Sequence, residues 1–321
     1  MYFPTADITV APWVPPLIAF GVSFFMSMGG VSGAFLLLPV QVSFLGFTSP
    51  AVSSTNQFFN VVAIPSGVYR YVREGRMVWP LAWMVILGTL PGVFIGALMR
   101  VAWLPDPRHF KLFVAGVLVY IGGRMVRDLA RRIRGIRGIR GIRGTGGTTR
   151  TEPHVMEKPQ HPRGDIAGNA PRQVAITRLS LTRLAYRFQG ETFEVSTITV
   201  SAVCFLVGIA GGVYGVGGGA IVAPFLVSVL GLPVYTVAGA ALMGTFVTSV
   251  AGVAFYQIIQ PWYPGMAVAP DWLLGALFGL GGTVGMYLGA RCQKYVSPKV
   301  ITWMLAGVIL LTAGKYLLEC I

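Results

Sequence analysis

The sequence predicts an all-α polytopic membrane protein built from two inverted repeats, each with a broken, re-entrant helix pair followed by three transmembrane helices. Three observations predict this fold: the composition, the distribution of the charges and an internal duplication. Of 321 residues, 54% are hydrophobic and 11% are charged, whereas a soluble domain carries about 25% charged residues. Fifteen of the 25 Lys and Arg residues lie between Arg124 and Glu194. Outside that segment, apolar blocks of roughly 20 residues are long enough to cross a bilayer.

Apolar windows predict six membrane-spanning helices near residues 50–70, 78–99, 110–127, 235–257, 271–291 and 299–318. Two further hydrophobic stretches, 12–47 and 196–232, are too long for one span. Glycine-rich sequence interrupts the middle of each stretch, at 28–33 in the first and 211–219 in the second. We call these two interruptions the first and the second break. Each stretch is therefore expected to form a pair of short helices.

An internal duplication relates the two stretches. A constant shift of 185 residues aligns Gly30 with Gly215 and Gly33 with Gly218, and after an insertion the shift becomes 193 residues. The glycines of a later span then align in order: Gly88, Gly92 and Gly96 with Gly281, Gly285 and Gly289. Further on, at a shift of 191 residues, Gly116 aligns with Gly307. Glycines at the spacing of a helical turn allow helices to pack closely. The sequence therefore predicts two copies of one motif.

The duplication defines a first transmembrane repeat at 1–128, a basic linker at 129–194 and a second transmembrane repeat at 195–321. The linker contains an Arg-Gly-Ile repeat that begins at Arg134. Glycine at every third position suits neither an amphipathic helix nor a strand, so we expect the linker to be largely disordered. The alternative is a strip of arginines on anionic lipid headgroups, worth about 1 kcal/mol per residue.

Basic loops predict the orientation, because cytoplasmic loops carry an excess of Lys and Arg. The loop at 70–76, the linker and the segment at 291–299 are all basic. All three would be cytoplasmic if each broken stretch entered and returned on one side of the cell membrane. The N-terminus, the aromatic loop at 261–270 and the C-terminus would then lie outside. A predicted loop with Arg100 and two further basic residues is the exception. Three spans after each pair would make the repeats inverted.

The breaks are the first candidate binding site. Unpaired backbone groups in lipid cost several kcal/mol, so irregular backbone at membrane depth needs burial or a water-filled cavity. Short helices beginning near Gly33 and Gly218 would each direct free N–H groups and a partial positive charge at an anion. In an inverted arrangement these two helix starts would converge. The alternative is that the glycines only allow close packing, although Gly217 to Gly219 are more than packing requires.

Polar side chains on the spans after the breaks are the second candidate. In the first repeat, polar residues at spacing i, i+3, i+4, i+7 share one helical face from Ser53 to Asn60. Buried polar residues in a membrane face a cavity or a partner helix. They would donate hydrogen bonds to an oxyanion; the alternative is bonding between helices. The candidate substrate-binding residues are Ser32, Gly33, Ser53, Asn56, Asn60, Gly217, Gly218, Thr245 and Thr248.

Several residue types are missing from the predicted spans. No Asp, Glu, Lys, Arg or His lies at the middle of a span, which disfavours a proton pump or a cation exchanger. Three widely spaced cysteines and three histidines in predicted loops make no metal-ligand cluster. We therefore expect no enzyme activity, no metal and no cofactor. The net charge of +14 fits an acid-poor membrane protein with basic loops, so no nucleic-acid partner is expected.

Four motifs carry a resemblance to a known family. They are Gly29-Gly30-Val31-Ser32-Gly33 with Pro39, Gly215-Val216-Gly217-Gly218-Gly219 with Pro224, Thr55-Asn56, and the Arg-Glu-Gly-Arg turn before Trp79. With these motifs the chain, apart from the linker, resembles the TauE/SafE family of sulfite and organosulfonate exporters. The resemblance implies movement of sulfite, sulfoacetate or related anions across the cytoplasmic membrane of a prokaryote.

Together these features predict a secondary transporter that exports sulfite or a related small sulfur-containing anion by alternating access. Two rival interpretations are a passive anion channel and a non-transporting membrane scaffold that recruits a partner through the Arg-rich linker.

Overall fold

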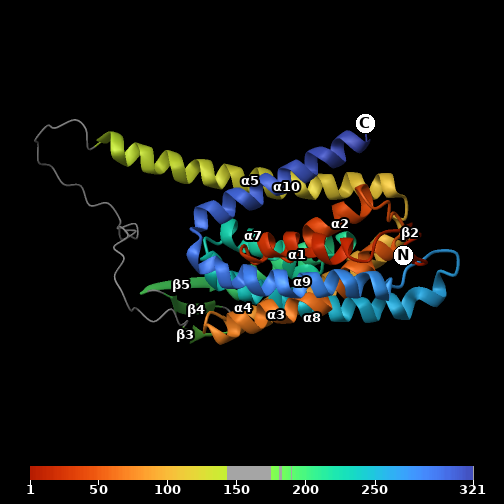
Figure 1. Ribbon diagram of the computed structural model, residues 1–321. Helices are drawn as coiled ribbons and strands as arrows, with labels where there is room; N and C mark the ends of the chain where they lie inside the picture. The colour runs from red at the N-terminus through yellow and green to blue at the C-terminus, as the bar shows by residue number, and fades with distance from the viewer. Residues whose placement is uncertain (143–174, 181–182, 189, 321) are drawn as a thin grey trace, which may run out of the picture.

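The computed structural model describes residues 1–142, 175–180, 183–188 and 190–320. Its helices form two sets in matching order (Figure 1). The first set is α1 (Val14–Ser27), α2 (Ala34–Ser43), α3 (Ala51–Arg73), α4 (Trp79–Ala102) and α5 (Pro107–Ile142). The second set is α6 (Thr197–Tyr214), α7 (Gly218–Val229), α8 (Val234–Ile259), α9 (Trp272–Cys292) and α10 (Pro298–Cys320). The predicted helical fold is confirmed, and each broken stretch forms two short helices separated at its glycines.

The described parts of the linker differ from the predicted disorder. Helix α5 continues into the Arg-Gly-Ile repeat as far as Ile142, although each Gly costs about 1 kcal/mol relative to Ala in a helix. Near the second repeat, β3 (Ala175–Leu179), β4 (Arg183–Phe188) and β5 (Glu191–Ser196) form an antiparallel sheet in that order. Residues 143–174 lie outside the described residues.

The sheet is attached to the helices through Tyr186. Its side chain is fully buried, and its hydroxyl hydrogen-bonds the Thr236 hydroxyl at the start of α8, at 2.9 Å. Burial raises the pKa of Tyr186 to about 12, against the lowering effect of that hydrogen bond. Four further short elements are described: the strands β1 (Tyr2–Phe3) and β2 (Ile8–Thr9), which form an N-terminal hairpin, and two 3-10 turns, η1 (Gln260–Trp262) and η2 (Gln293–Tyr295).

The bundle has two distinct ends (Figure 1). The linker end holds the β3–β5 sheet and the connections at 74–78 and 293–297, while the terminal end holds the N-terminus, the C-terminus and the connection at 260–271. The loop at 70–76, the linker and most of the segment at 291–299 therefore gather at the linker end, as the sequence predicted. That this end faces the cytoplasm stays a prediction.

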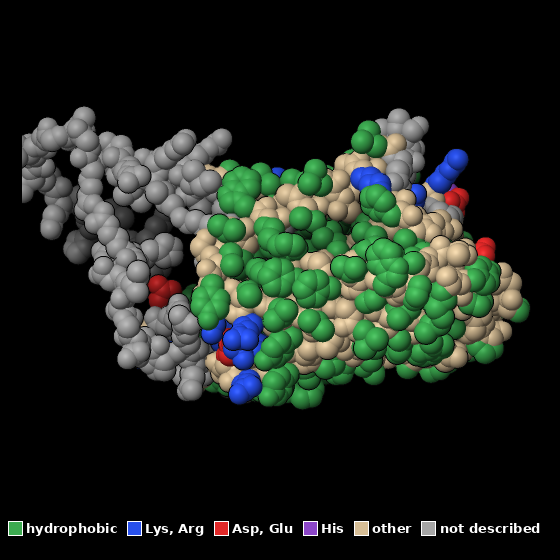
Figure 2. Space-filling model, in the orientation of Figure 1, with side chains coloured by type: hydrophobic (Ala, Val, Ile, Leu, Met, Phe, Trp, Pro, Cys, Tyr) green, Lys and Arg blue, Asp and Glu red, His purple; other side chains and the backbone are tan. Residues whose placement is uncertain are grey.

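The face between the two ends is covered by apolar side chains. Figure 2 shows hydrophobic side chains spread across it, with Lys and Arg confined to the ends. Large apolar residues such as Leu87, Leu206 and Leu280 are more than half exposed. Among the described residues, four helical segments are long and apolar enough to cross a membrane: α4, α6, α8 with η1, and α9 with η2. An exposed apolar surface of this extent is typical of a protein in lipid.

Equivalent helices of the two repeats pack in equivalent ways. Helix α6 packs on α4, and α1 packs on α9. A Cβ at Gly92 would fall too close to the Phe205 carbonyl, and a Cβ at Gly285 would fall too close to the Phe20 carbonyl. These contacts are related by the sequence shifts of 185 and 193 residues. The glycine rows therefore serve close helix packing, the role that the sequence assigned to them.

Helices α3 and α8 are antiparallel to each other. Asn60 on α3 bonds Ser249 on α8, whereas Tyr71, further along α3, lies against Gly239, nearer the start of α8. Because α3 and α8 are equivalent in the duplication, their antiparallel packing supports the predicted inversion, which stays a prediction as a relation across a membrane.

The broken pairs fold back on themselves as hairpins. Gly211 on α6 lies against Gly217 and Gly218, so α7 begins beside α6 and returns along it. Both outer ends of this pair lie at the linker end, since α6 follows β5 and the Tyr235 hydroxyl after α7 donates to the Val296 carbonyl at 3.1 Å. The pair α1–α2 opens at the terminal end instead (Figure 1). The two hairpins therefore enter the bundle from opposite ends.

Candidate functional site

The polar face of α3 lies at the contact between the two repeats. Ser53, Asn56, Gln57 and Asn60 are all fully buried. Gln57 lies directly against Gly252 of α8, and neither polar atom of its side chain has a hydrogen-bond partner among the described residues. Such a row of uncharged, buried polar groups is costly in a membrane unless it faces a cavity or a partner helix.

Two asparagines of this face hold both breaks. Asn56 Nδ2 donates to the Ala34 carbonyl at 2.9 Å and to the Gly215 carbonyl at 3.4 Å. Asn60 Nδ2 donates to the Val216 carbonyl at 2.9 Å. Ala34 follows the first break, and the other two carbonyls belong to the second, so these amides bring the two breaks together.

Asn60 also accepts a hydrogen bond from the first break. The Ser32 hydroxyl donates to Asn60 Oδ1, and Asn60 Nδ2 has a second acceptor in the Ser249 hydroxyl, at 3.2 Å. One amide therefore contacts the first break, the second break and α8. We call Ser32, Asn56, Asn60 and Ser249 the amide cluster.

At the start of each of the short helices α2 and α7, a backbone N–H donates a hydrogen bond to a side-chain hydroxyl. Ala34 N, at the start of α2, donates to Ser32 Oγ at 3.2 Å. Gly218 N, at the start of α7, donates to Thr248 Oγ1 at 3.2 Å. The sequence predicted free N–H groups here; instead each is bonded to a side chain.

Glycines in the breaks have a backbone reason as well as a packing reason. Gly30, Gly215 and Gly217 have φ values of +72°, +77° and +79°, a region that other residues rarely adopt. A Cβ at Gly30 would overlap Ala238, and one at Gly217 would crowd Ser249. Irregular backbone and close approach together account for these residues.

The predicted site residues divide between two neighbouring places. Ser32, Asn56 and Asn60 meet in the amide cluster, and Ser53 packs against Gly215 at the second break. The residues of the second repeat lie around the start of α7: Gly217 and Gly218 are packed by Thr245 and Thr248, whose hydroxyls also donate to the carbonyls of Ala241 and Gly244. Gly33 lies against Ser23 of α1. The structure brings both breaks and both polar faces into one buried region.

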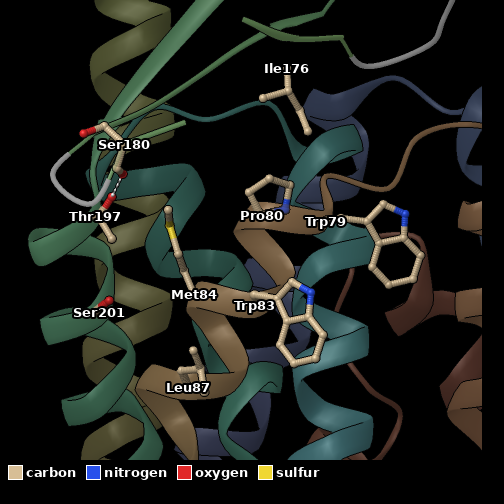
Figure 3. A pocket seen from close by; sticks show the side chains of 9 residues that line it. All are labelled: Trp79, Pro80, Trp83, Met84, Leu87, Ile176, Ser180, Thr197 and Ser201. Carbon is tan, nitrogen blue, oxygen red and sulfur yellow. Dashed lines mark hydrogen bonds between the residues drawn. The ribbon is translucent and has the colours of Figure 1, made fainter. Parts of the chain in front are cut away.

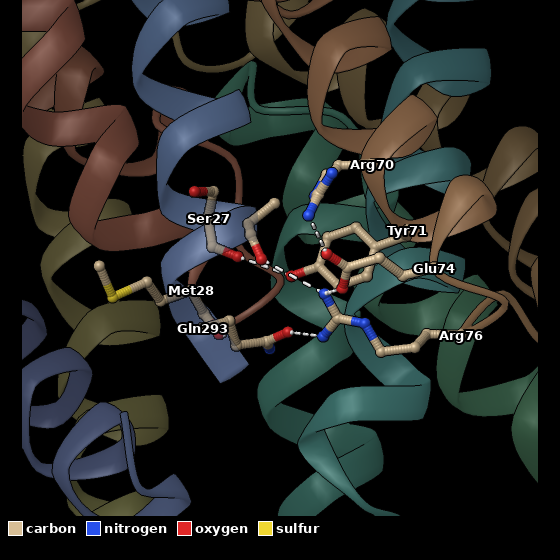
Figure 4. A network of polar contacts seen from close by, with 8 residues as sticks. Ser27, Met28, Arg70, Tyr71, Glu74, Arg76 and Gln293 are labelled. Carbon is tan, nitrogen blue, oxygen red and sulfur yellow. Dashed lines mark hydrogen bonds and ion pairs between the residues drawn. The ribbon is translucent and has the colours of Figure 1, made fainter. Parts of the chain in front are cut away.

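A polar network that the sequence did not assign caps the first break at the linker end (Figure 4). The Tyr71 hydroxyl donates to the Ser27 carbonyl at 3.1 Å, and Gln293 Nε2 donates to the Met28 carbonyl at 2.6 Å. The Ser27 carbonyl also accepts a hydrogen bond from Gly30 N at 3.1 Å, whereas the Met28 carbonyl lies past the last turn of α1 that could supply a donor. The network therefore pairs the backbone at this end of the break.

Charged side chains complete the network. Arg76 donates to Gln293 Oε1 and to the Ala290 carbonyl, and pairs with Glu74 at 2.5 Å; Glu74 also pairs with Arg70 at 2.6 Å. The sequence assigned Arg70 and Arg76 only to a basic loop. The Arg-Glu-Gly-Arg turn could have indicated this ion-pair network, because it places an acidic residue between basic residues that can share it.

An apolar pocket of about 580 Å³ lies outside this region, at the linker end (Figure 3). It is formed by the start of α4, the end of β3 and the start of α6, and is lined mainly by Trp79, Trp83, Met84 and Leu87. None of the predicted site residues line it. Among the described residues, no group of three or more His, Cys, Asp and Glu is placed to hold a metal ion.

The apolar outer face, the helices of membrane-spanning length and the buried uncharged polar region define a multi-pass helical membrane protein. The model of the sulfite exporter TauE/SafE family matches residues 16–316, nearly the whole chain. The chain therefore belongs to this family, and the predicted membership is confirmed. Proteins of the family are transporters rather than enzymes. No curated protein and no solved structure matches the chain.

Proposed function

We propose that this protein is a secondary transporter that exports sulfite or a related small sulfur-containing anion by alternating access. The anion binds where the two breaks meet, beside Asn56 and Asn60. The observation that carries the proposal is that these amides contact backbone of both breaks in a fully buried region. Family membership supports the class of substrate.

The chemistry of the region suits a weakly held oxyanion. Amide and hydroxyl groups supply hydrogen-bond donors without a charge, and the starts of α2 and α7 add the positive ends of two helix dipoles. Binding without a fixed opposite charge lets the anion leave again. A rearrangement that separates the breaks would break the bonds of Asn56 and Asn60 and open the region to one side.

The basic segments favour an orientation with the linker end in the cytoplasm, and the membrane potential favours export of an anion. Sulfite is largely a dianion at cytoplasmic pH. A membrane potential of 100 mV, negative inside, favours its exit by about 2.3 kcal/mol per charge. Export therefore needs no coupled proton.

Counterflow in proteoliposomes tests the proposal. Vesicles loaded with unlabelled sulfite, kept under nitrogen, should accumulate labelled sulfite through the wild-type protein. Asn56→Ala and Asn60→Ala should each slow the initial rate by about tenfold or more, since a lost hydrogen bond to a charged group costs about 1.5–3 kcal/mol. Ser66→Ala is the matched control, because Ser66 is on α3 but bonds Ala63 and Thr283 outside the amide cluster.

Each rival predicts a different result. A passive channel would show non-saturating flux without counterflow. A scaffold would show no flux, whether or not residues 143–174 are deleted, whereas the transporter should keep its flux after the deletion. If Asn56→Ala and Asn60→Ala both elute as folded protein in size-exclusion chromatography and both show counterflow at the wild-type rate, the anion binds elsewhere.

A further inference from the structure

Arg100 is fully buried in the last turn of α4, where the sequence predicted an exposed basic loop. That prediction is wrong because the neighbouring elements enclose the side chain. The guanidinium lies 3.9 Å over the ring of Phe110, and its Nη1 donates to the Leu104 carbonyl. Asp106 and Asp271, two acids of this end, make no ion pair with it: Asp106 lies beside His109, and Asp271 caps α9. The charge thus has no acidic partner among the described residues.

One edge of the Arg100 guanidinium is free. Nε and Nη2 are both buried and have no hydrogen-bond partner among the described residues. These two N–H groups lie on the same edge of the guanidinium plane and point the same way, which is the geometry that binds two oxygens of one oxyanion. A buried charge without a partner costs several kcal/mol, so this edge calls for an anion.

Two buried hydroxyl groups connect Arg100 to the second break. Tyr256 of α8 is fully buried and is close enough to interact with both Arg100 and Ser53. The Tyr256 and Ser53 hydroxyls are not aligned for a hydrogen bond to each other or to any other described group. Ser53 packs against Gly215 of the second break. Tyr256 thus links Arg100 to Ser53, and Ser53 links this group to the second break.

The residues equivalent to Tyr256 and Arg100 in the duplication make hydrogen bonds that Tyr256 and Arg100 do not make. The sequence shifts align Tyr71 with Tyr256 and Gln293 with Arg100. At the linker end, Tyr71 and Gln293 both donate to carbonyls of the first break. At the terminal end the same positions carry a guanidinium with two N–H groups that have no acceptor, and a hydroxyl that is aligned for no hydrogen bond among the described residues. Simple repetition of a structural contact does not explain this difference.

We infer that Arg100, Tyr256 and Ser53 form an oxyanion site beside the second break, at the terminal end of the protein. Its ligand is a small anion that presents two oxygens to one guanidinium edge, such as sulfite, a sulfonate or sulfate. The site rests on the proposed function only in that the transported anion is taken as its natural ligand. It supplies the positive charge that the amide cluster lacks, at the end where an exported anion leaves.

Binding to the purified full-length protein in detergent tests the site. Sodium sulfite and sodium sulfate are titrated against sodium chloride at matched ionic strength, by calorimetry and by thermal shift. Arg100→Gln should weaken sulfite binding by about tenfold or more, because it removes a charge-assisted bidentate contact. Arg100→Lys should bind with intermediate affinity, since it keeps the charge but loses the two-pronged edge. Arg108→Gln, an exposed arginine of the same end, should match wild type.

Tyr256→Phe provides a second variant that preserves the packing and removes one donor; it should weaken sulfite binding severalfold. Unchanged sulfite affinity in Arg100→Gln and Tyr256→Phe, or no sulfite binding by the wild-type protein, would overturn the inference. Counterflow that depends on Asn56 but not on Arg100 would overturn this site and leave the proposed function standing. Sulfite binding that depends on Arg100, without counterflow in proteoliposomes, would support this site and overturn the proposed function.

Discussion

The glycine rows allow the duplication to be tested by paired substitutions. Gly92 and Gly285 are equivalent, and an alanine Cβ at either would lie within 3.0 Å of a carbonyl oxygen, of Phe205 or Phe20 respectively. The helix pairs α4–α6 and α1–α9 must then separate by at least about half an ångström, which forfeits about a quarter of each close dispersion contact along the seam. We expect each variant to lose about 1–3 kcal/mol of unfolding free energy, the usual cost of overpacking.

A second equivalent pair supplies the control. Gly116 on α5 and Gly307 on α10 have no atom within 4 Å of the position of an added Cβ. Gly116→Ala and Gly307→Ala should therefore be neutral or gain up to about 1 kcal/mol from lower backbone entropy in the unfolded chain. The measurement is unfolding in mixed detergent micelles, followed by tryptophan fluorescence. Equal losses in all four variants would refute the packing argument, and a loss in only one of Gly92→Ala and Gly285→Ala would refute the equivalence of the seams.

Three further predictions concern the site and the orientation. Asn60→Asp should reduce sulfite counterflow more than Asn60→Ala. The aspartate carboxylate would repel the anion, whereas the alanine variant leaves a cavity that the anion can still enter. Gln293→Ala should cost about 1–3 kcal/mol, since the buried Met28 carbonyl loses its donor, and should speed amide hydrogen exchange of residues 28–33. In cells, a cysteine at Trp262, which is 71% exposed at the terminal end, should react with an impermeant thiol reagent, and a cysteine at Tyr295, 76% exposed at the linker end, should not.

Each of these has an opposing result. Counterflow in Asn60→Asp equal to or above that of Asn60→Ala would remove the anion from this residue. Unchanged exchange at 28–33 would show that Gln293 does not hold the first break. Labelling at Tyr295 alone, in a variant that lacks the native cysteines, would reverse the orientation and place the linker end outside.

The sequence predicted the helices and the duplication because both depend on local patterns. Apolar length and glycine order are visible along the chain, and the spacing from Ser53 to Asn60 placed the polar side chains on one face. The same spacing could not show that Asn56 and Asn60 would bond carbonyls of both breaks, because those carbonyls come from segments far apart in sequence.

The differences arise where tertiary contacts decide. Arg100 is buried because Phe110 and the Leu104 carbonyl enclose it, and composition alone assigns such a residue to a loop. Only the alignment of Arg100 with Gln293 carried a signal, a charge in one copy where the other is neutral. Likewise, the hydroxyls of Ser32 and Thr248 accept hydrogen bonds from the first N–H groups of α2 and α7. The spacing of residues along the sequence does not predict these bonds. The β3–β5 sheet depends on strand pairing and on the burial of Tyr186.

The glycine seams also determine which parts of the protein can move as units. Backbones in direct contact cannot slide past each other without collision, so α1 travels with α9 and α6 travels with α4. Each of these rigid pairs takes one helix from each half of the chain. The mechanical parts of the molecule therefore do not coincide with its two copies in sequence. Relative motion falls instead on the contacts that α3, α8 and the short helices make around the breaks.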